Sequence, residues 1–166
     1  MKKKLILICL IFSSVMYFSQ EANEVKIDAF GLFFNRIGVG YERIFSQNST
    51  VGARFLMKKT ENYYAVPFYR YYFQEDAYTY ATDLFLEGFA MYESYIPRDS
   101  EENLLDGGKR NSIIAAGLGI GEKADLSSGF FAEALLNAGV GKVLQPTSGS
   151  DYQLVIQISA SVGYRF

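Results

Sequence analysis

The sequence predicts an all-β chain: a transmembrane up-and-down antiparallel β-barrel of eight strands behind an N-terminal signal peptide. Three observations predict it. The stretch Tyr152–Phe166 alternates apolar with small or polar residues, which is the period of a strand. No apolar run after residue 20 approaches the ~18 residues of a membrane-spanning helix. Eight segments of strand character are separated by turn-forming residues.

The stretch Tyr152–Phe166 has two unlike faces. In steps of two, one face is apolar throughout, with Leu154, Ile156, Ile158, Ala160, Val162, Tyr164 and Phe166. The other face carries mostly Gln, Ser and Gly and only one charge, Arg165. A soluble sheet normally has long charged side chains on its wet face. The pattern therefore favours a barrel whose apolar face meets lipid and whose narrow interior is filled by small groups.

Residues 1–20 have the layout of a secretory signal peptide, and the barrel domain is predicted to be residues 21–166. Lys2, Lys3 and Lys4 precede the apolar run Leu5–Phe12, which contains the one cysteine, Cys9. An uncleaved membrane anchor is the alternative, but the apolar segment is shorter than the ~20 residues that a spanning helix needs.

The composition of residues 21–166 excludes several classes of function. Removal of the first 20 residues takes away three lysines and no acid, so the formal net charge moves from -2 to -5. The remainder has neither cysteine nor histidine. We therefore expect no disulfide framework, no imidazole base, no ordinary zinc site and no cofactor, and the missing basic surface argues against a nucleic-acid partner.

The eight predicted strands each have roughly the 9 to 11 residues of a tilted bilayer crossing, or slightly more. They are Glu24–Phe34, Ile37–Phe45, Thr50–Lys58, Tyr63–Phe73, Asp83–Glu93, Asn111–Gly121, Gly129–Val143 and Tyr152–Phe166. With a periplasmic N-terminus, the longest connection, Ser94–Arg110, falls on the cell-surface side, as this architecture requires.

Strand alternation also predicts which side chains face the interior. The inward set is polar and charged, and comprises Lys26, Asp28, Glu42, Arg54, Arg70, Glu87, Glu133, Asn137, Gln157, Ser159, Ser161 and Arg165. The bore of an eight-stranded barrel is filled by side chains, so we expect a structural core of ion pairs and hydrogen bonds. A narrow gated path for ions or solutes is the alternative.

Two further motifs have weak signals. Gly119–Ala124 fits the Gly-x-Gly-x-x-Ala pattern of dinucleotide-binding turns, but no helix is expected after it, so we interpret its glycines as interior-facing. The acidic segment Asp99–Gly108 suggests calcium, but its spacing misses the pattern of a calcium loop, so we expect a solvated loop and no metal site.

The chain resembles the small eight-stranded outer-membrane barrels of the OmpA transmembrane-domain and OmpX type. The resemblance is architectural, covers residues 24–166, and is carried by the ending SVGYRF, the segment PFYRYY at Pro67–Tyr72 and the repeated Gly-x-Gly. It implies an outer-membrane location and a monomer. It also implies that Val162, Tyr164 and Phe166 are an assembly signal, read by the barrel-assembly machinery after periplasmic chaperones deliver the chain. We expect no peptidoglycan-binding domain after the barrel and only short loops, which weakens any expectation of wall anchoring or of an adhesive sheet.

Three hypotheses of function remain open at this point. The first is a non-enzymatic outer-membrane protein with a role in envelope structure or surface contact. Barrel enzymes of this membrane generally rely on a catalytic histidine, and this chain has none. The second is a narrow pore for ions or small solutes. The third is a soluble calycin-like barrel that binds an apolar ligand, with its faces reversed.

Overall fold

The computed structural model describes residues 23–58, 62–73, 81–97, 108–144 and 151–166. These residues form an antiparallel, closed up-and-down barrel in which each strand pairs with its neighbours in the sequence and β1 pairs with β8. The strands are β1 (Asn23–Asp28), β2 (Arg36–Ser46), β3 (Ser49–Lys58), β4 (Asn62–Tyr72), β5 (Asp83–Tyr95), β6 (Asn111–Ser127), β7 (Phe130–Val143) and β8 (Tyr152–Arg165). No helix among the described residues is long and apolar enough to cross a membrane. The predicted eight-stranded all-β barrel is confirmed.

The two chain-terminal strands close the barrel through their backbones. The amide of Asn23 donates to the carbonyl of Phe166 at 2.9 Å, and the amide of Phe166 donates back to Asn23 at 2.8 Å. From there the ladder continues between β1 and β8 as far as Asp28 and Ser161. We call the end of the barrel that holds these residues the terminal end, and the opposite end, where α2 (Ala29–Leu32) lies, the loop end.

The first predicted strand is too long, which is a correction. Residues Glu24–Phe34 were expected to be extended, but β1 stops at Asp28 and α2 follows. The Asp28 carboxylate accepts a hydrogen bond from the Gly31 amide at 3.0 Å, which caps the first turn of this helix. The connection to β2 is therefore longer than the predicted turn Asn35–Arg36, and Arg36 itself belongs to β2.

The sixth predicted strand is too short. The segment Glu122–Ser128 was expected to turn the chain, but β6 continues through Ser127. The turn to β7 consists of Ser128 and Gly129, both with positive φ, which is typical of the tight two-residue turn whose twist matches a hairpin. Glu122–Ser127 therefore extends the barrel wall and turns Lys123 into the interior.

The alternation of faces follows the prediction on the strands. Leu118, Leu136 and Ile156 are among the many apolar side chains that are exposed on the outside, whereas Phe85, Glu87 and Met91 are among those buried inside. Pro67, which lacks an amide, points outward from β4. The ladder to β5 is interrupted at Val66 and Pro67 and resumes in the same register, which is how this strand accommodates a proline.

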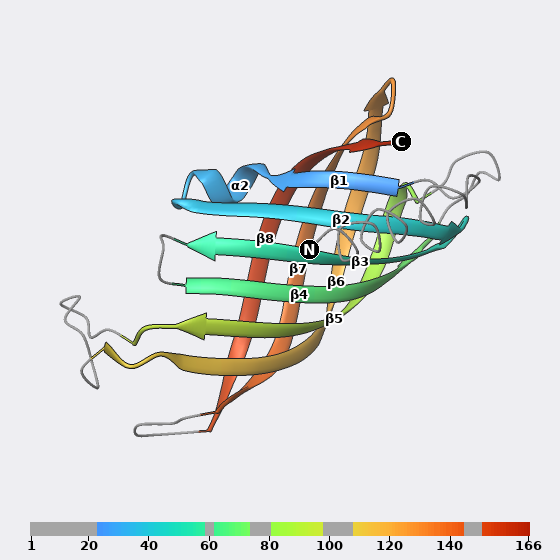
Figure 1. Ribbon diagram of the computed structural model, residues 1–166. Helices are drawn as coiled ribbons and strands as arrows, with labels where there is room; N and C mark the ends of the chain where they lie inside the picture. The colour runs from blue at the N-terminus through green and yellow to red at the C-terminus, as the bar shows by residue number, and fades with distance from the viewer. Residues whose placement is uncertain (1–22, 59–61, 74–80, 98–107, 145–150) are drawn as a thin grey trace, which may run out of the picture.

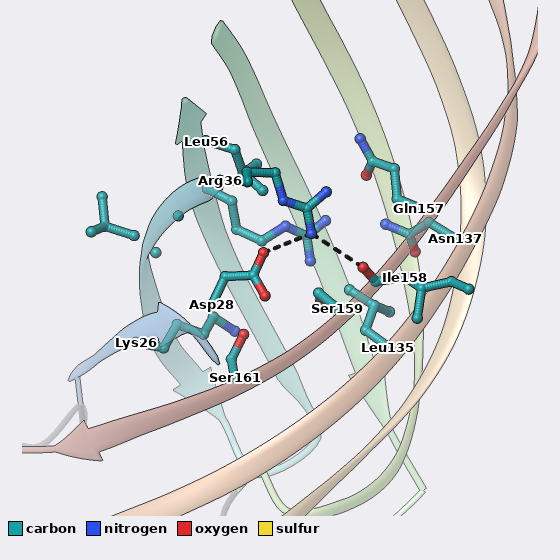
Figure 2. Close-up of a pocket in the computed structure, with 14 residues that line it drawn as sticks. Lys26, Asp28, Arg36, Leu56, Leu135, Asn137, Gln157, Ile158, Ser159 and Ser161 are labelled. Carbon is teal, nitrogen blue, oxygen red and sulfur yellow. Dashed lines mark hydrogen bonds and ion pairs between the residues drawn. The ribbon is translucent and has the colours of Figure 1, made fainter. Parts of the chain in front are cut away.

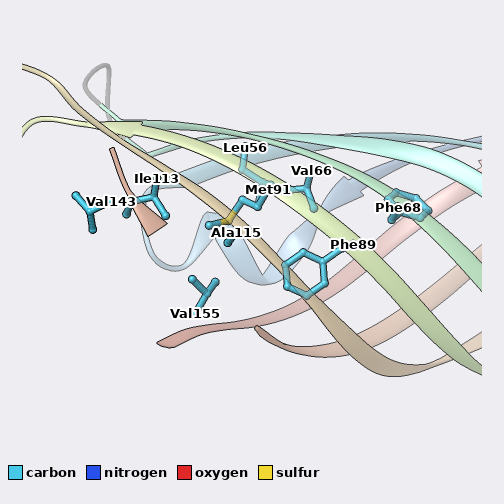
Figure 3. Close-up of a cluster of buried hydrophobic side chains, with 9 residues drawn as sticks. All are labelled: Leu56, Val66, Phe68, Phe89, Met91, Ile113, Ala115, Val143 and Val155. Carbon is cyan, nitrogen blue, oxygen red and sulfur yellow. The ribbon is translucent and has the colours of Figure 1, made fainter. Parts of the chain in front are cut away.

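The interior has an apolar part towards the loop end. Its buried residues, shown in Figure 3, are Leu56, Val66, Phe68, Phe89, Met91, Ile113, Ala115, Val143 and Val155. Phe68 ends this cluster and borders the charged groups described next. Opposite Phe68, Gly52 leaves the room that its ring needs, since a Cβ at Gly52 would lie 2.4 Å from the ring. The glycines of the strands thus make space for large interior side chains.

Candidate functional site

Arg70 of β4 is the centre of the charged interior. Its side chain is fully buried. Nε donates to Glu87 at 2.8 Å, and Nη1 donates to Glu133 at 2.8 Å and to Glu42 at 3.0 Å. One guanidinium therefore holds three carboxylates that come from β2, β5 and β7. A fixed fork of donors suits arginine, and not lysine, to this position.

Two further cations complete the compensation of these carboxylates. Lys26 Nζ donates to Glu42 at 2.7 Å and to both oxygens of Glu133 at 2.9 Å. Arg54 donates through two nitrogens to the two oxygens of Glu87. A buried charge is tolerated when it is both paired and hydrogen-bonded, and each of these groups meets that condition.

Neutral side chains donate further hydrogen bonds to these carboxylates, and aromatic rings pack against the cations. Thr50 and Tyr72 donate to the second oxygen of Glu42 at 2.6 and 2.8 Å, and Asn137 donates to Glu87 at 2.9 Å. The ring of Phe68 lies within 5.2 Å of Lys26, Arg54 and Arg70, measured to its centroid. Such contacts stabilise cations that have left water.

A second layer of ion pairs lies nearer the terminal end. Lys123 donates to Glu24, and its Nζ lies 3.5 Å from Glu42, which links the two layers. Arg165 pairs with Glu24 at 2.8 Å and with the half-exposed Asp125 at 3.3 Å. Together the two layers, which we call the ion cluster, hold five cations and five carboxylates among the described residues: Lys26, Arg54, Arg70, Lys123 and Arg165 with Glu24, Glu42, Glu87, Asp125 and Glu133.

The structure brings most of the predicted interior residues together. Glu42, Arg54, Arg70, Glu87 and Glu133 share the first layer of the ion cluster, and Asn137 donates a hydrogen bond to Glu87. Arg165 lies apart in the second layer. Gln157 lies apart towards the loop end, where its Nε2 meets the sulfur of Met91 at 2.9 Å. The predicted group is therefore spread along the bore.

Sequence reasoning missed several members of the ion cluster or its shell. Lys123 was assigned to a turn, although Lys123 and Asp125 continue the inward parity of β6. Glu24 was taken only as the start of a strand, although it shares a face with Lys26. Tyr72 was left out because its neighbours Tyr71 and Phe73 read as an outward aromatic row.

The remaining predicted sites have simple placements. Gly119–Ala124 lies within β6 and opens no helix; its inward Gly119 lies against Asn137. Val162, Tyr164 and Phe166 lie on the outer face and are exposed. The segment Asp99–Gly108 falls, except for Gly108, outside the described residues.

A hollow on the loop-end side of the ion cluster opens between β2 and β8. It is lined by groups from five strands, among them Lys26, Asp28, Arg36, Asn137 and Ser159 (Figure 2). Arg36 Nη2 donates to Asp28 at 2.8 Å and to the carbonyl of Ile158 at 3.3 Å. Two of its lining residues each contain a buried polar atom, Arg36 Nε and Asn137 Oδ1, that has no hydrogen-bond partner among the described residues. The hollow has room for little more than a water molecule.

Comparison of the chain with protein-family models, with curated proteins and with solved structures gives no significant match.

Proposed function

We propose that the protein is an integral outer-membrane β-barrel, non-enzymatic, with a role in envelope structure or surface contact. One observation carries the proposal: the polarity of the molecule is inverted. Every strand presents exposed apolar side chains outward, for example Ile27, Val39, Phe55, Tyr69, Leu86, Leu118, Leu136 and Ile156. The charged side chains of the ion cluster are inside.

This inversion is costly in water and favourable in lipid. Monomeric soluble proteins rarely expose apolar patches of more than a few hundred Å², and this apolar face continues around the barrel. In hydrocarbon the same face is solvated, and a closed barrel satisfies backbone groups between its strands. The inversion therefore supports a lipid-facing outer surface over the alternative of a soluble calycin-like barrel.

Exposed aromatic residues gather at both ends of the outer face, which supports the same proposal. At the terminal end they are Tyr41, Phe45, Tyr69, Tyr71, Phe73, Phe130, Tyr164 and Phe166. Towards the loop end they are Phe30, Phe33, Phe34, Tyr63, Tyr92 and Tyr152. Two such girdles separated by an apolar band are typical of barrels whose ends lie at the two interfaces of a bilayer.

The location and partners belong to the proposal. Residues 1–20 direct export, and Val162, Tyr164 and Phe166 present the assembly signal to the barrel-assembly machinery once periplasmic chaperones have delivered the chain. The barrel then works as a monomer among outer-membrane lipids. It has no nucleic-acid partner and needs no cofactor.

The ion cluster supports a structural interior over catalysis or conduction. Each buried carboxylate accepts from at least two donors, so none is free to act as a base. Arg70 and its partners also cross the bore between β2, β4, β5 and β7. We expect no single-channel steps from the folded protein in a planar bilayer; regular steps would favour the narrow pore.

Spin labelling tests the proposal directly. Because residues 21–166 have no cysteine, Ile156→Cys and its neighbour Gln157→Cys each give one labelling site, outward and inward. In liposomes, we expect the label at 156 to be accessible to oxygen and shielded from a water-soluble nickel chelate. The label at 157 is the control and should show low oxygen access.

Fractionation and gel mobility complete the test. The protein is expected in the outer-membrane fraction, and the unboiled form should run faster than the boiled form on a denaturing gel. A wetted label at 156, or extraction without detergent, would overturn the proposal.

A further inference from the structure

The barrel wall is incomplete between β8 and β2 at the loop end. The ladder of β1 with β8 ends at Asp28 and Ser161, because the chain turns into α2. The first part of β8, residues 152–160, is paired with β7 alone. Figure 1 shows β8 running away from β1 beyond this point. We call the gap bordered by this part of β8, α2 and the start of β2 the wall notch.

Backbone groups of β8 face the wall notch. The Phe166 amide bonds towards β1 and the Arg165 amide bonds towards β7, so even-numbered residues of β8 turn their backbone groups to the β1 side. Leu154, Ile156 and Ile158 follow this rule. Among the described residues, the one bond they receive there is from Arg36 Nη2 to the Ile158 carbonyl. Such a strand edge is costly in an apolar medium unless polar groups occupy the gap.

The polar interior reaches the outer face through the wall notch. The hollow of Figure 2 is lined by the inward Lys26 and Ser159 and also by the outward Val39 and Ile158. A second hollow, of about 230 Å³ and partly open to the outside, is lined by Arg36, Gln153 and Gln157 with the outward Leu154 and Ile156. Arg36, Leu56 and Gln157 border both, so the two hollows adjoin.

Hydrogen-bond donors with unused capacity point to an acceptor. Arg36 Nε is buried and has no partner in the described structure. Gln157 Nε2 has only the thioether of Met91, which is a weak acceptor. Lys26, Arg54 and Arg36 are already paired with carboxylates, and Glu93 lines the second hollow. The unused donors therefore favour an occupant whose polar part is rich in hydrogen-bond acceptors.

The outer border of the wall notch is apolar. Phe30 and Leu32 of α2, its C-cap residue Phe33, and Ile156 and Ile158 of β8 are all exposed there. α2 packs near β8 without a hydrogen-bonded ladder. An occupant that satisfies both borders has a small head rich in hydrogen-bond acceptors and an apolar tail.

We propose that the wall notch binds a long-chain fatty acid. Its carboxylate accepts hydrogen bonds from Arg36 Nε and Gln157 Nε2, and its acyl chain leaves the barrel between α2 and β8, along Ile156 and Ile158. The inner hollow has room for little more than a water molecule and excludes a phosphodiester headgroup, whereas the smaller carboxylate lies at its mouth, where the two hollows adjoin at Arg36 and Gln157. The inference rests on the proposed function, because the chain must leave into lipid.

The absence of tryptophan makes a direct binding measurement possible. Ile156→Trp places a reporter at the wall notch, and Ile120→Trp places a matched reporter on the outer face of β6, away from it. Both variants are titrated in phosphocholine detergent micelles with palmitic acid brominated on its chain. We expect saturable quenching at position 156 and only weak, linear quenching at position 120.

Two variants test the assigned contacts on the Ile156→Trp background. Arg36→Gln removes the charged donor and should raise the Kd about tenfold, since hydrogen bonds to charged groups are worth at least that factor. Arg43→Gln removes a cation from the other end of the same strand and should leave the Kd unchanged. Ser159→Phe fills the inner hollow without changing charge and should weaken binding as strongly. If Arg36→Gln fails to fold, Ser159→Phe still tests whether the ligand binds at this site.

Three results would overturn the inference. They are linear quenching of equal strength at positions 156 and 120, a Kd that neither Arg36→Gln nor Ser159→Phe alters, and efficient disulfide cross-linking of an Ile156→Cys variant into dimers, which would assign the notch to a second copy. Any of these leaves the proposed function intact if the spin labels still report lipid at position 156. Wetting of that label overturns both.

Discussion

The two halves of the barrel interior are held together by different chemistry. Towards the terminal end, the ion cluster binds strands β1 to β8 through charges that are each held by several partners. Towards the loop end, the cluster around Met91 and Val155 is apolar and is held together mainly by dispersion contacts and by the burial of apolar area. One barrel geometry therefore accommodates either a charged or an apolar interior, but the two kinds of interior respond differently to substitution. Loss of one charged side chain leaves its buried partners with uncompensated charge, whereas loss of one apolar side chain leaves a cavity of its own size.

The largest effect is expected from Arg70→Leu. It removes one cation and leaves Glu42, Glu87 and Glu133 short of a buried partner. We expect a loss of about 5 kcal/mol in the free energy of unfolding, enough to prevent folding in many conditions. Urea titration in liposomes, read by gel mobility of the unboiled protein, measures it. A loss below about 1 kcal/mol would mean that water reaches the ion cluster.

A smaller and graded effect is expected in the apolar half. Phe89→Ala should cost about 3 kcal/mol because it leaves a cavity among Val66, Met91 and Ala115. Phe89→Leu should cost about 1 kcal/mol, because most of the volume is kept. The same urea titration compares the two. Equal losses for both variants would contradict a graded, cavity-limited response.

Lys123→Met sharpens the comparison inside the ion cluster. Glu24 keeps Arg165 and Glu42 keeps Arg70 after this change, so the expected loss is about 2 kcal/mol, less than for Arg70→Leu. The double variant Lys123→Met with Glu24→Gln is the control. Its loss in the free energy of unfolding should be smaller than the sum of the losses of the two single variants, because each single change leaves the other side chain without this partner.

The smallest effect is expected at the exposed margin of the ion cluster. Asp125→Asn alters the 3.3 Å pair with Arg165, in which the Asp125 side chain is 48% exposed. We expect a loss of about 0.5 kcal/mol, which 1 M salt should abolish. A loss as large as that of Lys123→Met would place Asp125 inside the cluster proper.

The sequence was sufficient for the strands and for the direction of their side chains. Alternation on β8 and β5 placed Ile156 outside and Glu87 inside because the strand period admits only two choices. The end of β1 was missed because Ala29–Phe34 is apolar on both faces, and only the cap from Asp28 to Gly31 decides for a helix. The end of β6 was missed because its last segment, Glu122–Ser127, carries several charges, which is typical of exposed loops.

Partners across the bore could not be predicted in the same way. Arg70 meets Glu133 from a strand 63 residues away, and that meeting depends on the register of every ladder between them. Alternation fixes a face but not a height along the barrel axis. For this reason Gln157 and Arg165 were grouped with residues that lie at other levels. The wall notch arises because β1 ends at Asp28, so it could not be predicted from the alternation either.

The mutual hydrogen bonds of Asn23 and Phe166 impose an order of events on the chain. Until the chain is complete, its strands can form at most seven neighbouring pairs, because β1 cannot yet pair with the end of β8. No shorter nascent piece is a closed barrel, so enclosure of Lys26 and Arg70 is an all-or-none step that follows synthesis of the last strand. Fragments truncated at the C-terminus should therefore be cleaved by proteases and should not form a smaller closed barrel.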